Sequence, residues 1–190
     1  MKTEFTSSSS YLSFKLGEEM FAINVLRVNK IVQIGKVTYT PHTPACIRGI
    51  IHLDGATLSV IDLHVKLAIP VMGKPAIHEP AIKKSDFDSL ENNCLTVVTV
   101  HYLAANNKIK QNYTIGVLVD SVVEVFDLAE DQIKPLPDLG IDLNATPIKG
   151  TCQVGKELIL LLDTDKVFSP TQLSTVSDLD LLLSHLEDFL

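Results

Sequence analysis

The sequence contains no tryptophan, three cysteines and no long hydrophobic run. Its apolar runs span a handful of residues, such as Leu158 to Leu162, whereas a membrane-spanning helix requires about 20. The N-terminus lacks the basic region and apolar stretch of a secretory signal. Acidic residues outnumber basic ones by 23 to 16, and a net charge of -7 disfavours binding to nucleic acid or anionic lipid. These absences predict a cytoplasmic protein without direct membrane insertion.

Motifs for metal binding and catalysis are also missing. The cysteines Cys46, Cys94 and Cys152 are far apart, and no second Cys or His stands at ligand spacing. The six histidines show no metal-ligand spacing either. No Gly-rich phosphate loop, Ser nucleophile elbow or Cys/His pair is visible. We therefore expect buried reduced thiols, no metal, no cofactor and no catalytic residue.

What the sequence does contain is a series of short apolar runs rich in Val and Ile, separated by turn residues, which predicts a mainly β protein. A first hairpin is expected from Tyr11 to Val25, and Asp54-Gly55 is the strongest two-residue hairpin signal. The other predicted strands lie at 28–34, 48–53, 57–61, 95–102, 113–120, 121–126, 151–154 and 157–162. The polar segment 105–112 is expected to form a hairpin tip.

An internal repeat indicates two similar small barrels. The sequence Ile47-Arg48-Gly49, followed by a hairpin, an apolar strand and Asp62, recurs as Ile148-Lys149-Gly150, a hairpin, an apolar strand and Asp163. Upstream, residues 21–26 parallel residues 113–118. Each lobe alone is close to the size at which a core is marginal, so we expect the lobes to share an apolar seam.

The repeat and the linker-like segments predict the domain organisation. We expect a flexible N-terminus at 1–10, a first lobe at 11–67, a Pro-rich connection at 68–93, a second lobe at 94–168 and a C-terminal helix at 169–190. The helix is amphipathic, because leucines recur at helical spacing with acidic residues on other faces. It either packs on its own barrel or docks in the groove of a partner.

The repeated Asp62 and Asp163 allow two interpretations. Two lobes that each supply one carboxylate are typical of an aspartic-type hydrolase, which predicts that the two carboxylates lie within hydrogen-bonding reach. That signature requires Gly two positions after each Asp, but His64 and Asp165 stand there. The structural interpretation, which we favour, is that each Asp caps the first turn of a short helix.

The chain resembles the CheW-like coupling domains of bacterial chemotaxis, whose motifs it matches in order across both lobes. The matching segments are Tyr11 to Glu19, Ile23 to Val28, Thr43 to Gly49, Val60 to Leu63, Ile115 to Val122, Leu139-Gly140, Ile148 to Gly150 and Leu158 to Asp163. The central connection, the hairpin tip and the tail lack counterparts.

The resemblance implies two SH3-like five-stranded barrels and a non-catalytic adaptor. Such domains join the cytoplasmic tip of a chemoreceptor to the regulatory domain of a CheA-type histidine kinase, in arrays at the inner face of the membrane. It also implies that Val28 and Ile31 face the receptor. Gly49 and Gly55 matter in the family, and here they also suit close backbone approach and the hairpin turn.

The sequence departs from the family pattern at two charged positions. Lys30 stands where the family usually has Glu, and Asp54 where it usually has Arg, so both signs are inverted together. If the side chains face each other, an ion pair survives with reversed polarity, and a partner that reads either charge meets the opposite one. This leaves open an alternative function, a scaffold of the same fold diverted to another partner, such as in surface motility or polar localisation. The other interpretation of the two charges has equal weight. In it, Asp54-Gly55 only improves the hairpin turn, and Lys30 is a solvated strand residue.

Overall fold

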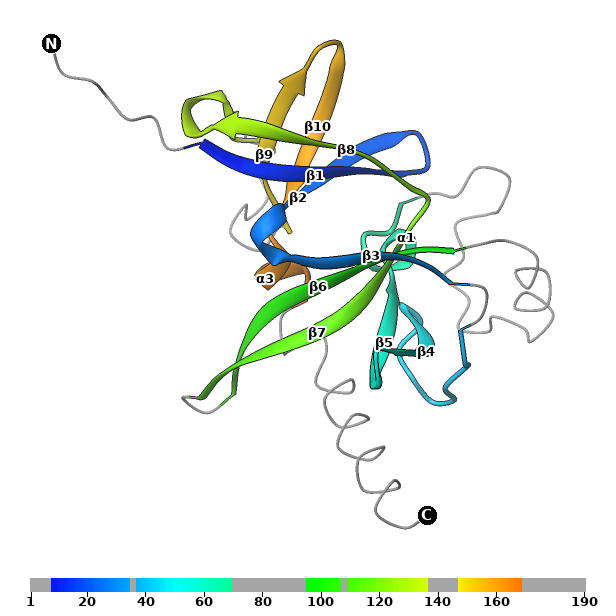
Figure 1. The fold of residues 1–190 in the computed structure, drawn as a ribbon. Helices are drawn as coiled ribbons and strands as arrows, with labels where there is room; N and C mark the ends of the chain where they lie inside the picture. The colour runs from blue at the N-terminus through cyan, green and yellow to red at the C-terminus, as the bar shows by residue number, and fades with distance from the viewer. Residues whose placement is uncertain (1–7, 35–36, 70–94, 107–108, 137–146, 169–190) are drawn as a thin grey trace, which may run out of the picture.

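The structure, a computed structural model, describes residues 8–34, 37–69, 95–106, 109–136 and 147–168 (Figure 1). The C-terminal helix and nearly all of the connection predicted from the sequence lie outside these ranges. The strands are β1 (Ser8–Leu16), β2 (Glu19–Asn24), β3 (Val28–Ile34), β4 (Ile47–Leu53), β5 (Ala56–Asp62), β6 (Leu95–Asn106), β7 (Ile109–Val119), β8 (Ser121–Ala129), β9 (Ile148–Val154) and β10 (Glu157–Leu162). The short helices are η1 (Val25–Arg27), α1 (Leu63–Lys66), η2 (Glu130–Gln132) and α3 (Thr164–Val167).

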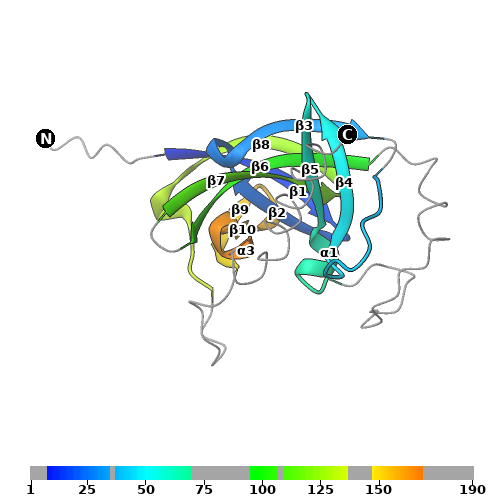
Figure 2. The same ribbon diagram turned by 90° about the horizontal axis from the view of Figure 1, so that it is seen from below.

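These strands form two five-stranded sheets, which confirms the predicted mainly β fold. Sheet A has the order β8-β1-β2-β10-β9, and sheet B has the order β3-β6-β7-β5-β4. The pairings Thr38–Ile50 and Lys134–Thr151 add a short bridge to the outer strands β4 and β9. Figure 2 shows β9 and β10 with α3 on one side of the molecule, and β4 and β5 with α1 on the other.

The predicted division into continuous lobes needs correction. Sheet A combines β1 and β2 with β8, β9 and β10, while sheet B combines β3, β4 and β5 with β6 and β7. Neither 11–67 nor 94–168 therefore forms a sheet by itself. The chain leaves sheet A at η1, directly after β2, and enters sheet B at β3.

The two sheets are related in the way the sequence repeat predicts. Exchanging β1 to β5 for β6 to β10 in the same order converts the order of sheet A into that of sheet B. Each sheet also contains one parallel contact between the halves, β2 with β10 and β5 with β7. Each half of the chain thus contributes a hairpin to the sheet of the other half.

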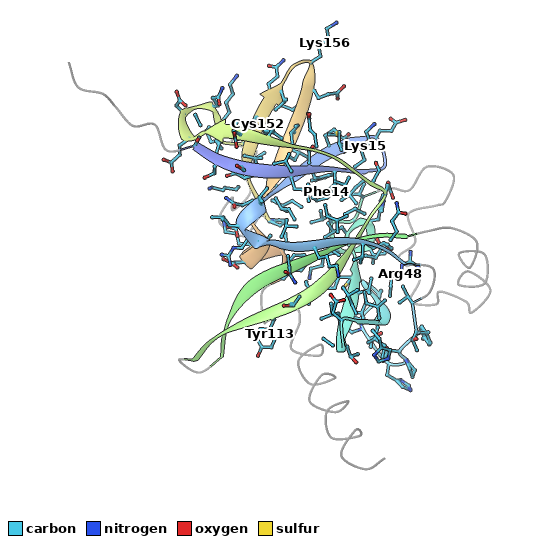
Figure 3. The ribbon with its side chains drawn as sticks, viewed as in Figure 1. Phe14, Lys15, Arg48, Tyr113, Cys152 and Lys156 are labelled. Atoms are coloured by element: carbon cyan, nitrogen blue, oxygen red, sulfur yellow. The ribbon has the colours of Figure 1, made fainter. Side chains whose placement is uncertain are left out.

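A shared apolar seam joins the sheets, as the sequence predicts. Phe14 and Phe21 of sheet A pack with Ile61 and Ile115 of sheet B, and Phe14 lies between the sheets (Figure 3). Two smaller clusters fill the individual sheets, one around Ile159 and the other around Val60. Burial of this kind contributes about 25 cal/mol per Å² of apolar surface, so the seam stabilises both sheets at once.

Asp120, between β7 and β8, adds a polar link across the molecule. Its carboxylate accepts a hydrogen bond from the backbone N–H of Gly17 at 2.7 Å and lies 3.0 Å from Nε2 of the buried His64. Gly17 lies in the turn between β1 and β2 of sheet A, whereas His64 follows β5 of sheet B. One side chain thus joins the ends of both sheets.

Several strand ends differ from the prediction. β1 begins at Ser8 instead of Tyr11, because Ser8 to Ser10 pair with β8 and the Ser10 hydroxyl donates to Asp127. β8 continues to Ala129, and β6 and β7 extend to Asn106 and Ile109, into the expected hairpin tip. Strands are predicted from alternating apolar and polar residues, and the polar residues at these strand ends do not show that alternation.

Candidate protein-interaction surface

The surface that the resemblance assigns to the receptor lies on β3, an edge strand of sheet B. β3 pairs with β6 on one side, and the register shifts between Val28 and Lys30, which leaves Asn29 as an extra residue. Such a bulge bends an edge strand and re-aims its side chains. Ile31 is 43% exposed, whereas Val28 is half-buried against the seam. β3 therefore presents an apolar side chain on a strand that, among the described residues, lies at an edge of sheet B.

Lys30 and Asp54 connect this strand to the β4–β5 hairpin. The Lys30 Nζ atom lies 2.8 Å from Oδ2 of Asp54, and the side chains are 47% and 69% exposed. The turn depends on left-handed backbone at both central residues, with φ of 52° at Asp54 and 81° at Gly55. The ion pair that the sequence suggested with reversed polarity is thus formed. Its exposure limits its contribution to stability to about 0–1 kcal/mol.

Gly49, on β4, is buried. A Cβ atom added there would stand 2.1 Å from the carbonyl oxygen of Thr38, and the φ of 138° is unfavourable for other residues. Gly55 differs, because a Cβ atom there would meet nothing within 4 Å. Gly49 therefore shapes the β4 edge, whereas Gly55 is accessible to a partner.

Asp62 and Asp163 cap separate helices, as the favoured interpretation predicts. Asp62 accepts hydrogen bonds from the backbone N–H groups of His64 and Val65, and its other carboxylate oxygen binds the guanidinium of Arg48. Asp163 accepts from the N–H groups of Asp165 and Lys166. Each carboxylate is committed to its own helix. The aspartic-type hydrolase, which requires the two to share a proton, is therefore excluded.

The described cysteines are free thiols, as expected, but only one of them is fully buried. Cys152 is buried and Cys46 is half-buried, and both are free, while Cys94 lies outside the described residues. Burial raises the pKa of the Cys46 thiol, and the nearby Lys66 opposes that shift. Burial also raises the pKa of Cys152. Neither is an activated nucleophile, since reactive cysteines have lowered pKa values.

Within the described ranges, no group of three or more His, Cys, Asp or Glu side chains could hold a metal ion. In the same ranges no helix is long and apolar enough to cross a membrane.

A second apolar surface, on β8, was not predicted from the sequence. Val123 and Val125 are 47% and 58% exposed on this edge strand of sheet A. β8 takes the place in sheet A that β3 takes in sheet B, and extending the alignment of Phe21 with Tyr113 brings Ile31 opposite Val123. The repeat could therefore have identified this surface.

Comparisons with known proteins agree with this architecture. A sequence model described as the CheW-like domain matches residues 10–172. A probable chemotaxis protein CheW from Rhizobium etli is 27% identical over 161 residues, which cover 85% of this chain and 88% of the relative. The chemotaxis protein CheW of Klebsiella aerogenes is 27% identical over 173 residues, covering 91% and 89%.

A solved structure supports the fold independently. The crystal structure of the scaffolding protein TtCheW from Thermoanaerobacter tengcongensis aligns with a TM-score of 0.61 and 24% identity, over 85% of this chain and 93% of that one. The family match includes strands of both sheets. It also includes the β3 surface, the name used here for Val28, Lys30, Ile31, Asp54 and Gly55. The chain belongs to the CheW-like domain family.

Proposed function

We propose that this chemotaxis coupling adaptor joins the cytoplasmic tip of a chemoreceptor to the regulatory domain of a CheA-type histidine kinase. The family is one of adaptor scaffolds, and the described residues offer surfaces instead of a reactive centre. On this proposal the adaptor works in the cytoplasm and is recruited to receptor arrays at the inner face of the membrane.

The observation that carries the proposal is the β3 surface. An exposed Ile31, on an edge strand of the described part of sheet B, suits the apolar face of a receptor helical hairpin. Lys30, Asp54 and Gly55 lie at the rim, where charges select partners more than they add affinity. Val28 is half-buried and packs against the seam.

The receptor contact is tested with Ile31→Asp. This change places a charge on the proposed apolar contact without opening a core cavity, because Ile31 is already partly exposed. We expect receptor-tip affinity to fall by about tenfold or more, as for a central interface residue. Leu158→Asp is the matched control, since Leu158 is exposed on β10 of the other sheet. Equal loss in both variants, or none in Ile31→Asp, would refute the contact.

The inverted ion pair supports a more specific proposal about partner choice. Lys30→Glu combined with Asp54→Arg restores the family polarity while preserving an opposite-charge pair. If partners read these charges, the double variant binds standard kinase and receptor fragments more tightly and its own partners more weakly. Unchanged affinity for all of them would show that the pair only supports the hairpin turn. If the double variant binds only the standard kinase and receptor fragments more tightly, that result would favour an adaptor that serves a divergent array.

A further inference from the structure

The hairpin formed by β6 and β7 extends well beyond its sheet. Pairing of β6 with β3 ends at Val100, and pairing of β7 with β5 involves Gly116 to Leu118. From His101–Thr114 to Asn106–Ile109 the two strands pair with each other. Among the described residues, no third strand joins this ribbon, which projects from the molecule in Figure 1. We call residues 101–106 and 109–114 the arm.

A two-stranded ribbon of this kind is marginally stable in water. Three strands with an apolar face, or packing against a helix, are needed for independent stability. The arm includes described residues of the predicted hairpin tip 105–112, which has no counterpart in the family pattern. A covering element would therefore stabilise the arm.

The arm has a charge that contrasts with the rest of the chain. No Asp or Glu occurs between residues 95 and 119, although the whole chain has 23 acidic residues and a net charge of -7. Lys110 adds a positive charge within the arm. A covering element should therefore be acidic.

The C-terminal segment 169–190 has the complementary composition. It contains Asp178, Asp180, Glu187 and Asp188 and no Lys or Arg, and its leucines recur at helical spacing. The match to the CheW-like domain ends at residue 172, so nearly all of this segment is also an addition to the family domain. An amphipathic helix needs an apolar surface on which to pack.

The segment begins beside the base of the arm. It follows α3, and α3 lies against β6. Asp165 of α3 also pairs with Arg27 of η1, the turn that leads into β3 where its pairing with β6 starts. A segment tethered at this point is present at millimolar effective concentration near the arm, which favours it over a separate partner.

We propose that the C-terminal segment 169–190 packs as a helix across the β6–β7 arm and forms with it an accessory unit outside the two sheets. A helix of this segment is long enough to cross the ribbon, because six strand residues span roughly 20 Å and 20 helical residues roughly 30 Å. The leucine face covers the ribbon, while the acidic residues lie toward the arm's positive charge. This proposal is independent of the receptor and kinase contacts.

Hydrogen exchange of the full chain tests the packing. We expect arm amides to be protected in the unmodified protein and to exchange about tenfold faster in the Leu179→Asp/Leu183→Asp variant, because the leucine face no longer packs. Amides of β1 and β2 should be unchanged. Leu158→Asp controls for an added Asp on another exposed surface, and Lys110→Glu should weaken protection where Lys156→Glu does not.

Three results would overturn the proposal. The first is an arm that exchanges freely in the unmodified chain. The second is arm protection that the leucine variant leaves intact. The third is protection that disappears on dilution, which would make a second copy of the chain the covering element.

Discussion

Asp62 and Asp163 occupy equivalent positions in the two halves of the chain but make different interactions. Both cap a short helix, yet only Asp62 is buried and also bound to Arg48, at 2.6 Å. Removing it leaves a mostly buried guanidinium without this partner. We therefore expect the same substitution to have unequal effects at the two positions.

Alanine at each position measures that difference by urea denaturation. Asp163→Ala should lower the free energy of unfolding by about 1 kcal/mol, the usual effect of losing a cap. Asp62→Ala should lower it by about 3 kcal/mol, since a cap and a largely buried ion pair are both lost. Equal losses would contradict the importance assigned to Arg48.

The two glycines of the β4–β5 hairpin, Gly49 and Gly55, give a second matched pair. Gly49→Ala should destabilise by about 3 kcal/mol, because the added methyl meets the Thr38 carbonyl in a strained backbone conformation. Gly55→Ala should cost about 1 kcal/mol, since only the left-handed turn is disfavoured. Thermal unfolding of both variants checks this. A stable, folded Gly49→Ala protein would show that Gly49 acts through partner contact instead.

Cys46 provides a test that depends on pH. Its raised pKa means that the thiolate forms at higher pH than in a free thiol, so alkylation should be slow near neutral pH and rise late. Lys66→Gln removes the opposing positive charge, raises the pKa of Cys46 further and slows alkylation. Mass spectrometry of the Cys46 peptide measures the rate, with Lys156→Gln as control. Faster alkylation in Lys66→Gln would contradict the assignment.

At the scale of elements, hairpins could be predicted from the sequence and their partners could not. Turn residues such as Asp54-Gly55 act locally, and alternating apolar residues identify β1, β2 and β5. The parallel contacts of β2 with β10 and β5 with β7 join distant segments, and alternation is the same whichever strand lies alongside. Continuous lobes were predicted for this reason.

Some features of the candidate surface could likewise be predicted from the sequence, and others could not. Lys30 and Asp54 were identified because the family resemblance supplied their pairing. The burial of Gly49 depends on Thr38, which reaches it through the isolated bridge to Ile50. The exposure of Val123 and Val125 depends on β8 lying at an edge of sheet A. These facts require the three-dimensional arrangement.

At the scale of the whole molecule, the interleaved strands and shared seam predict one cooperative unfolding transition. Phe14→Ala, in the seam, should lower stability by about 4 kcal/mol and reduce hydrogen-exchange protection in both sheets together. Calorimetry combined with hydrogen exchange measures this. Two separate transitions, or loss confined to sheet A, would show that the sheets are independent domains.

On the proposed function, this molecule holds two proteins together. Analytical ultracentrifugation of the full chain with a CheA-type kinase regulatory domain and a chemoreceptor tip fragment tests it most directly. We expect a ternary complex that forms only when the adaptor is present. With Ile31→Asp, only the complex of adaptor and kinase should remain. A chain that binds neither fragment, or binds each only by displacing the other, would contradict it.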